Sequence, residues 1–380
     1  MTPFGFVTPA RHLVGRGTRA LVAAEVAALA GRAVLVRGTS VPWADTLADD
    51  LAATGVAVQV ITGQGEPTID QLRAALDTAR PFRPDCVVAV GGGAVLDLGK
   101  ALAALMPGTG DPVRHFEVVG EGRPLDGTPL PFVAVPTTAG TGAEATRNAV
   151  IGMPGQGLKV SLRDPRMVAR LAVVDPALTD GAPRAVTLAS GLDAVTQLIE
   201  PYLSCRANIL TDALCRDAIP QGIAALVRLV DTEDPAARDA LARTSFLGGI
   251  ALSNAGLGAV HGLAGVIGGR VGGAHGAICG RLLVPVLRAN HQAMSGNAAW
   301  LDRLMQVHGW LFAALPGRGD GVARLADFVD AQDLPRLGAL GVTAGDIPGI
   351  AEDAARSSSM KANPVALPAG VLEDVLRQAL

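Results

Sequence analysis

The sequence predicts an α/β domain with a parallel sheet, followed by an all-α domain. Strand-like and helix-like segments alternate over the first half of the chain, whereas only helical periodicity follows Pro183. The composition adds a third observation, because 49% of the residues are hydrophobic but only 3% are aromatic. A core built from Ala, Val, Leu and Gly suits helices and strands that approach one another closely.

The first half contains apolar runs joined by short connections rich in Gly and Pro. These runs predict strands at 33–36, 56–61, 85–90, 132–135 and 172–175. Helical spacing predicts helices at 43–53, 68–78 and 94–106. Alternation of this kind is typical of a parallel sheet that is covered by helices on both faces.

The second half shows helical periodicity alone. It predicts helices at 185–204, 209–230, 235–254, 277–290, 296–315, 325–330, 347–356 and 369–380. We therefore expect two domains, one spanning residues 1–182 and the other residues 183–380. A cleft between two such domains is the default place for a ligand.

Charge and composition exclude several classes of partner. The chain has 32 basic and 35 acidic residues, a net charge of −3 and few aromatic side chains, so we expect no nucleic-acid partner. No stretch reaches the roughly 18 apolar residues of a membrane span, and the N-terminus does not resemble a signal peptide. The four cysteines lack CxxC spacing and are expected to be buried, reduced thiols, which favours a soluble cytoplasmic protein with no membrane partner.

A glycine-rich turn, Gly91-Gly92-Gly93, follows one predicted strand and opens a helix. Glycines there let backbone N–H groups approach a phosphate, and the helix dipole favours an anion. The alternative is a flexible turn without a ligand. Asp97 and Lys100, three residues apart, are equally consistent with a surface ion pair.

A polar loop follows the next strand, with the sequence PTTAGTGAE at 136–144. Its hydroxyl groups, from Thr137, Thr138 and Thr141, can hydrogen-bond phosphate, ribose or carboxamide groups. A plain helix-capping loop is the alternative.

One carboxylate and two imidazoles in the helical half form a plausible set of ligands for a divalent metal ion. Asp193 and Gln197 lie four residues apart on one helical face, while His261 and His275 lie in Gly-rich segments. Taken alone, each of these residues is more often a hydrogen-bonded core residue than a metal ligand. Cys279 lies four residues after His275, which leaves a thiolate ligand open as an alternative. The remaining histidines are expected at the surface, namely His12, His115, His291 and His308.

These segments together resemble the iron-containing (group III) alcohol dehydrogenase superfamily. The matching segments are GGGAVLDLGK at 91–100, PTTAGTGAE at 136–144, VVDPALT at 173–179, GLDAVTQLIEPYLS at 191–204, NAGLGAVHGLAG at 254–265 and HGAICGRLLVPVLRAN at 275–290, with Asn363-Pro364 near the end. The resemblance implies an NAD(P)-binding α/β domain over 1–182 and a helical metal- and substrate-binding domain over 183–380.

The resemblance also assigns roles to individual residues. It implies cofactor contacts for Gly92, Gly93, Ala94, Asp97, Thr137, Thr138, Thr141 and Lys159. It implies that the metal ligands, and through the metal the catalytic residues, are Asp193, His261 and His275. The ion is expected to be Fe²⁺, with Zn²⁺ as the alternative.

Two positions depart from the family pattern. Gln197 stands where the family usually has a second ligand histidine, so we retain it only as an optional ligand through its amide oxygen. Gly265 stands where many members have a histidine that is assigned to a proton relay. Metal-bound water would then have to replace that side chain.

The choice between NAD and NADP depends on the residues that follow the predicted strand at 33–36. NAD-preferring relatives place an Asp there, which binds the ribose 2′-OH and repels a 2′-phosphate. This chain has Gly38, followed by the hydroxyls of Thr39 and Ser40. The sequence therefore favours NADP over NAD.

The activity implied by the resemblance is reversible hydride transfer between NAD(P)H and a small aldehyde or ketone. Arg147 could bind a substrate carboxylate, as in a maleylacetate-reductase-like activity, and an ordinary surface arginine without a ligand is the alternative. One alternative is a dehydrogenase homologue that binds the cofactor without metal, consistent with Gln197 and Gly265. Another is a lyase of the dehydroquinate-synthase type, disfavoured because the chain has only three lysines. A β segment before Gly15 would suit a homodimer.

Overall fold

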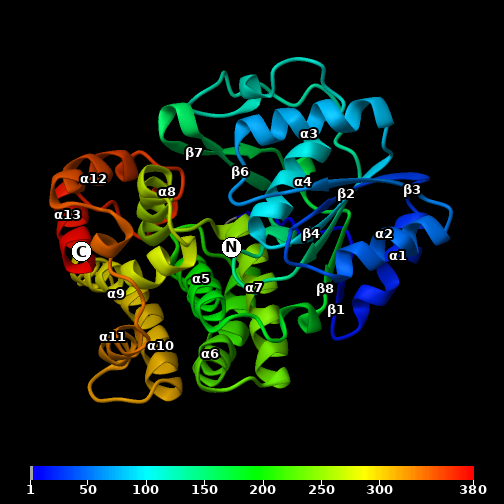
Figure 1. The fold of residues 1–380 in the computed structure, drawn as a ribbon. Helices are drawn as coiled ribbons and strands as arrows, with labels where there is room; N and C mark the ends of the chain where they lie inside the picture. The colour runs from blue at the N-terminus through cyan, green and yellow to red at the C-terminus, as the bar shows by residue number, and fades with distance from the viewer. Residues whose placement is uncertain (1–2) are drawn as a thin grey trace. The chain divides into compact units, whose positions relative to one another are not determined.

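The computed structural model describes residues 3–380, which fall into two compact units. The sheet unit comprises residues 7–138 and 142–180, and the helical unit comprises residues 3–6, 139–141 and 181–380. Figure 1 shows their elements coloured along the chain. The predicted fold class, a parallel α/β domain followed by a helical domain, is confirmed.

The sheet unit is built on six parallel strands in the order β1-β8-β5-β4-β2-β3. They are β1 (His12–Val14), β2 (Arg32–Arg37), β3 (Ala57–Thr62), β4 (Cys86–Gly91), β5 (Phe132–Pro136) and β8 (Leu171–Val174). The register places Leu35 beside Val88 and Val88 beside Val133. Strand β4 is buried along its whole length, as its continuous apolar sequence requires in a sheet that is covered on both faces.

Helices cover both faces of this sheet. Helices α1 (Val22–Ala27) and α2 (Trp43–Ala53) pack against one set of strand side chains, and α3 (Ile69–Phe82) and α4 (Gly93–Leu105) pack against the alternate set. The period-2 alternation of a strand sends neighbouring side chains to opposite faces. Because helices bury both faces of the sheet, a ligand can reach it only at the loops that follow the strand ends.

An antiparallel hairpin that the sequence analysis did not predict follows the polar loop. It consists of β6 (Asn148–Met153) and β7 (Leu158–Arg163). Asp97 on α4 holds the hairpin, because its Oδ2 accepts a hydrogen bond of 2.9 Å from the backbone N–H of Val150. Short 3₁₀ helices connect the unit's elements at Thr18–Leu21, Pro112–His115, Ala143–Ala145, Pro154–Gln156, Pro165–Met167 and Pro176–Thr179.

Lys100 is buried on α4, so its ion pair with Asp97, at 3.9 Å between Nζ and Oδ1, does not lie at the surface as expected. Its Nζ donates to the carbonyl oxygens of Ala143 (2.6 Å) and Asn148 (2.9 Å) and to Oγ1 of Thr146 (2.6 Å). Burial lowers the pKa of Lys100 to about 8, so the ammonium group is still charged at neutral pH. One buried cation thus connects α4 to the end of the polar loop.

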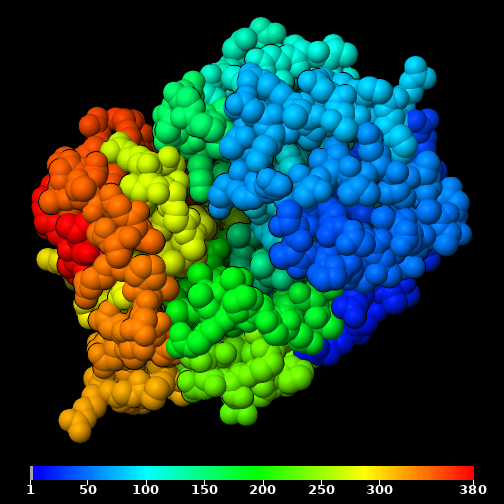
Figure 2. Space-filling view, in the orientation of Figure 1, coloured from blue at the N-terminus to red at the C-terminus, as the bar shows by residue number. Residues whose placement is uncertain are grey.

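The helical unit is organised around a long buried helix, α5 (Arg184–Leu203). The other helices are α6 (Ile209–Asp231), α7 (Pro235–Ala255), α8 (Ala259–Val271), α9 (His275–Ala293), α10 (Ala298–Ala314), α11 (Gly321–Ala331), α12 (Ile347–Ala355) and α13 (Ala369–Ala379), with 3₁₀ turns at Leu337–Leu340, Ala344–Asp346 and Met360–Ala362. A single aliphatic core runs through them. In Figure 2 the orange atoms of α10 and α11 form one continuous surface of this unit.

Several expectations about single residues are wrong. Cys205 is exposed, because it lies in the turn between α5 and α6, while the other three cysteines are buried. His115 and His308 are buried rather than at the surface: Nδ1 of His115 lies 3.1 Å from the carbonyl oxygen of Arg123, and His308 lies on the inner face of α10.

Within residues 3–380, the structure contains no single helix that is both long and apolar enough to cross a membrane. The pair α7 and α8 passes that test together, although the two helices meet at an angle of 101°.

We expect the buried carboxyl of Glu144 to control part of the pH dependence of stability. Burial raises the pKa of Glu144 from 4.5 to about 7, so the folded state binds this proton more tightly than the unfolded chain. The free energy of unfolding should therefore fall by about 3 kcal/mol as the pH rises from about 4.5 to about 7. Glu144→Gln should remove this component in urea titrations at several pH values. Glu121→Gln, at an exposed position, should leave the dependence of the free energy of unfolding on pH as it is in the wild type. The same pH dependence in the wild type and in Glu144→Gln would show that Glu144 does not contribute to it.

Candidate functional site

Four potential metal ligands converge in the helical unit. They are Asp193 on α5, His261 on α8, and His275 and Cys279 on α9, and one donor atom from each lies within 4.8 Å of the others. Oδ1 of Asp193 is 3.2 Å from Nε2 of His261 and 4.0 Å from Nε2 of His275. The structure thus brings together the three ligand residues that the sequence analysis selected.

Close contact between α5 and α9 places two of these donors. A Cβ atom on Gly276 would lie 2.0 Å from the carbonyl oxygen of Ala189, and one on Gly280 would lie 2.6 Å from the side chain of Leu192. Only glycine at both positions lets the helix backbones approach this closely. His275 precedes Gly276 and Cys279 precedes Gly280, so the close approach of the helices places both side chains near Asp193.

Two side chains from outside α8 fix its first turn and therefore place His261. Oδ1 of Asn363 accepts from the N–H of Ala259 (3.1 Å), and Oε1 of Glu200 accepts from the N–H of Val260 (2.7 Å). These bonds satisfy N–H groups that have no partner within a helix. Gly258 is required here, since a Cβ would lie under 3.0 Å from both side-chain oxygens.

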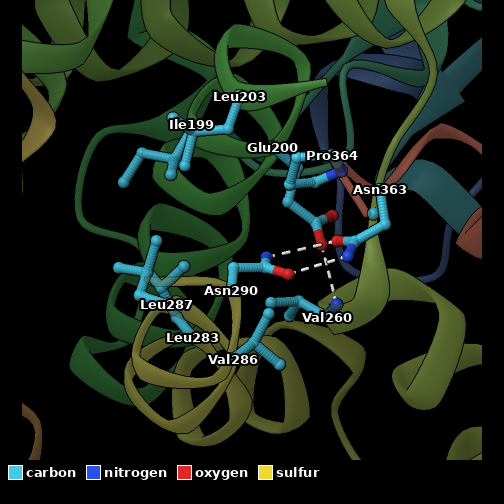
Figure 3. A pocket seen from close by; sticks show the side chains of 11 residues that line it. Ile199, Glu200, Leu203, Val260, Leu283, Val286, Leu287, Asn290, Asn363 and Pro364 are labelled. Carbon is cyan, nitrogen blue, oxygen red and sulfur yellow. Dashed lines mark hydrogen bonds between the residues drawn. The ribbon is translucent and has the colours of Figure 1, made fainter. Parts of the chain in front are cut away.

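Glu200 also orients the imidazole of His261. Its Oε2 lies 2.6 Å from Nδ1 of His261, so the ring presents Nε2 to Asp193. Figure 3 shows the Glu200 carboxylate beside Val260 and the paired amides of Asn290 and Asn363, at the wall of an apolar pocket. Such a carboxylate behind a histidine is typical of metal-binding histidines, because it fixes the ring and increases its basicity.

The electrostatics of the four residues favour a cation. Burial raises the pKa of Asp193, but the hydrogen bond from His261 and the charge of His275 outweigh burial and hold that pKa below its usual value. The neighbouring Cys279 side chain, followed by Asp193, raises the pKa of His275 to about 9. Asp193, His261 and Cys279 are buried, whereas the side chain of His275 is 32% exposed, which makes the cluster accessible from that side.

A divalent metal ion fits this donor set. It offers carboxylate oxygen, two imidazole nitrogens and sulfur, the types of donor that bind Zn²⁺ and Fe²⁺ in proteins. Glu200 supplies the outer hydrogen bond that such sites require.

Gln197 lies one helical turn after Asp193, as predicted. Its Nε2 donates to the carbonyl oxygen of Thr141 at 2.7 Å, which anchors residues 139–141 to α5. Gly265 lies on α8 one turn after His261, and a Cβ there would meet no atom within 4 Å. The absence of a histidine at position 265 is therefore not imposed by packing.

The glycine turn of the sheet unit has the geometry that the sequence analysis expected. Gly91 ends β4, Gly92 is the extended residue before α4, and a Cβ on Gly91 would lie 2.6 Å from Val95. No side chain caps the first turn of α4, and that turn holds no acidic residue. A helix N-terminus without a side-chain cap and with a positive dipole end fits a phosphate of a dinucleotide.

The other predicted cofactor residues surround this turn or lie farther along the unit. Thr138 lies against Gly92, since a Cβ on that glycine would be 3.4 Å from its Oγ1, and the N–H of Thr137 bonds to Gly91. Ala94 follows Gly93 in the first turn of α4. Nζ of Lys159, on β7, lies 3.6 Å from a carboxylate oxygen of Glu66.

The end of β2 carries the residues proposed to select the cofactor. The N–H of Gly38 donates to the carbonyl oxygen of Val90, and a Cβ at this position would be no closer than 3.5 Å to another atom. Thr39 and Ser40 are exposed beside it. Arg147 is partly exposed just before β6.

Glu200 and the role of Asn363 were not predicted from the sequence. Glu200 lies seven residues after Asp193, two turns along one helical face, and this spacing was a usable signal. Asn363 contacts residues about 100 positions earlier, and no local pattern indicates such a partner.

The fold is shared with solved structures of two-domain oxidoreductases. A solved structure described as 1,3-propanediol oxidoreductase matches all of this chain and all of its own, with a TM-score of 0.88 and 28% identity. The archaeal halo-thermophilic alcohol dehydrogenase ADH/D1 from a Red Sea brine pool shares the fold, with a TM-score of 0.90 at 23% identity over 100% of this chain and 99% of that one.

The chain belongs to the iron-containing alcohol dehydrogenase family. Residues 9–176 match the profile of iron-containing alcohol dehydrogenases, and residues 187–380 match the C-terminal profile of the same family. Alcohol dehydrogenase 4 of Schizosaccharomyces pombe is 30% identical over 366 residues, covering 95% of this chain and 85% of that protein. The NAD-dependent methanol dehydrogenase of Bacillus methanolicus is 28% identical over the full length of both. The protein is therefore an oxidoreductase of the alcohol dehydrogenase type.

We expect Gly276→Ala to disturb both stability and the donor cluster. The new methyl group meets backbone atoms of α5, so the helices must separate, at a cost of about 1–3 kcal/mol or more. Urea unfolding and metal titration would both report the change. Gly265→Ala is the matched control, because that helical position is open and should gain up to about 1 kcal/mol. Unchanged stability and metal affinity in Gly276→Ala would show that the contact is not required.

Glu200→Gln should weaken metal binding about 10–100-fold while the fold is retained, because the amide cannot supply the charge that holds His261. Metal affinity is measured by competition with a chromophoric chelator, and circular dichroism checks the fold. Glu233→Gln, at an exposed carboxylate of the same unit, should bind metal as the wild type does. An affinity unaltered in Glu200→Gln would remove Glu200 from the site.

Proposed function

We propose that this protein is a metal-dependent NAD(P)H-linked alcohol dehydrogenase that interconverts small alcohols and their aldehydes or ketones. The single observation that carries the proposal is the convergence of Asp193, His261 and His275 from three helices into one buried cluster. The family relationship and the glycine turn before α4 agree with it.

The helical unit would hold the metal through Asp193, His261 and His275, with Gln197 as an optional ligand. When bound, a divalent ion supplies Lewis acidity, which polarises a carbonyl group and stabilises the negative charge that develops on its oxygen. Fe²⁺ is the ion that the family description favours, and Zn²⁺ is the alternative. Glu200 keeps His261 in the orientation and tautomer that presents Nε2, and the exposed edge at His275 admits a small substrate.

The sheet unit would bind the dinucleotide. Gly92, Gly93 and Ala94 would meet the pyrophosphate at the start of α4, and Thr137 and Thr138 would donate or accept hydrogen bonds along the cofactor. Thr141, a residue of the helical unit, is proposed to contact the cofactor as well. Asp97 and Lys159 are proposed to lie beside it. Gly38, with the hydroxyls of Thr39 and Ser40, leaves room for a 2′-phosphate without a repelling carboxylate, so NADP is favoured over NAD.

Arg147 and the edge strand β1 are the features from which a substrate class and a homodimer are proposed. Arg147 would bind a substrate carboxylate, which makes a maleylacetate-reductase-like activity one form of the proposal. A cytoplasmic homodimer is the proposed setting, supported by β1, which is the terminal strand of the sheet and can be extended by a second copy.

Metal analysis combined with activity tests the proposed function. The purified protein should contain one divalent ion per chain and oxidise NADPH in the presence of a panel of small aldehydes and ketones. Chelation should abolish turnover, and Asp193→Ala should lose the ion and reduce turnover at least about 100-fold, since a Lewis acid contributes several kcal/mol. Cofactor binding without metal or turnover would instead identify a homologue that has lost catalysis.

Gly38→Asp should shift the cofactor preference from NADPH toward NADH. A carboxylate about 4 Å from a 2′-phosphate is repelled by about 4 kcal/mol at a protein surface, so the ratio of kcat/KM for NADPH to that for NADH should fall more than about tenfold. Gly38→Asn is the matched control, with the same size and no charge. If both variants change the ratio equally, size rather than charge determines the preference.

A further inference from the structure

Cys279 belongs to the donor cluster as closely as the three expected ligands do. Its sulfur lies 3.6 Å from Nε2 of His275 and within 4.8 Å of the donor atoms of Asp193 and His261. The residue is fully buried, on the face of α9 that meets α5.

The spacing of the donor atoms matches a tetrahedral metal site that includes sulfur. A zinc ion with a Zn–S bond of about 2.3 Å and Zn–N or Zn–O bonds of about 2.1 Å holds S and N about 3.6 Å apart, and N and O about 3.4 Å apart. The observed separations are 3.6 Å between the sulfur and His275, and 3.2 and 4.0 Å between Asp193 and the two imidazoles. Small rotations of these side chains would therefore complete the tetrahedron.

The backbone leaves the sulfur little freedom to move away. Gly280 follows Cys279 and packs against Leu192, and Gly276 packs against the backbone at Ala189. Helix α9 is thus held against α5 on both sides of the cysteine. Gln197, the other potential fourth donor, already uses its amide nitrogen to hold Thr141.

We propose that Cys279 is the fourth protein ligand of the metal and that its thiolate makes Zn²⁺ the preferred ion. Thiolate ligands select zinc over harder, more oxygen-seeking ions. Zinc sites in enzymes can expand to five ligands when a substrate binds, so a fourth protein ligand is compatible with catalysis. This inference rests on the metal-binding part of the proposed function and specifies its ligand set.

X-ray absorption at the zinc edge tests the ligand directly. The full-length protein is stripped with a chelator and reloaded with one equivalent of Zn²⁺. We expect one sulfur scatterer at about 2.3 Å beside nitrogen and oxygen scatterers at about 2.0–2.1 Å. Cys279→Ala should lose the sulfur scatterer and bind Zn²⁺ more than about tenfold more weakly, because loss of an outer partner alone costs about 10–100-fold.

The matched control is Cys215→Ala, at a buried cysteine on α6 of the same unit that is not one of the clustered donors. It should keep both the sulfur signal and the affinity. A wild-type spectrum with nitrogen and oxygen scatterers only would overturn the proposal without any variant, and so would a sulfur signal that persists in Cys279→Ala. Competition between equimolar Fe²⁺ and Zn²⁺ under anaerobic conditions should load the wild type with zinc, and preferential loading with iron would contradict the stated preference.

The outcomes separate this inference from the proposed function. One zinc ion per chain, lost in Asp193→Ala but free of sulfur, would leave the dehydrogenase proposal intact and remove Cys279 from the ligand set. Failure of the wild type to bind any divalent ion would overturn the metal site itself, and this inference with it.

Discussion

The close approach of α9 to α5 is the constraint on which the candidate site depends. Gly276 lies against the backbone of Ala189 and Gly280 against the side chain of Leu192, so the distance between the two helices depends on the absence of a side chain at both glycines. Asp193, His275 and Cys279 all project from these two helices near that contact. Only His261 comes from elsewhere, and the capping of α8 by Glu200 and Asn363 brings it into position.

The architecture was predictable because its signals are local. The buried strands around β4 are continuous apolar runs, and the long helices have the period of an amphipathic face, so their type follows from short windows of sequence. The hairpin β6–β7 was not predictable in this way. Its strands are as long as β2 and β4 but are not buried along their whole length, and contacts from Asp97 and Lys100, about 50 residues earlier, hold the hairpin in place. The burial of Lys100 has the same origin, since its acceptors are backbone carbonyls that no composition rule indicates.

The candidate site was predictable as a set of residue types but not as a geometry. An Asp on a helix and two histidines beside glycines suggested the ligands, and the structure brings those three side chains together. Glu200 and Asn363 were missed because their partners lie about 60 and 100 residues away along the chain. The position of Cys279 depends on which face of α9 is turned toward α5. Tertiary packing determines that face, and a local sequence pattern does not reveal it.

The exposed Cys205 gives this chain one thiol whose chemistry differs from that of the others. Burial raises the pKa of the Cys86 and Cys215 thiols, and they are shielded from reagents as well. Thiol reactivity requires both thiolate and access, so alkylating probes should modify Cys205 first. A fluorophore or spin label attached in the turn between α5 and α6 would report on the helical unit while the buried sulfur of Cys279 stays untouched.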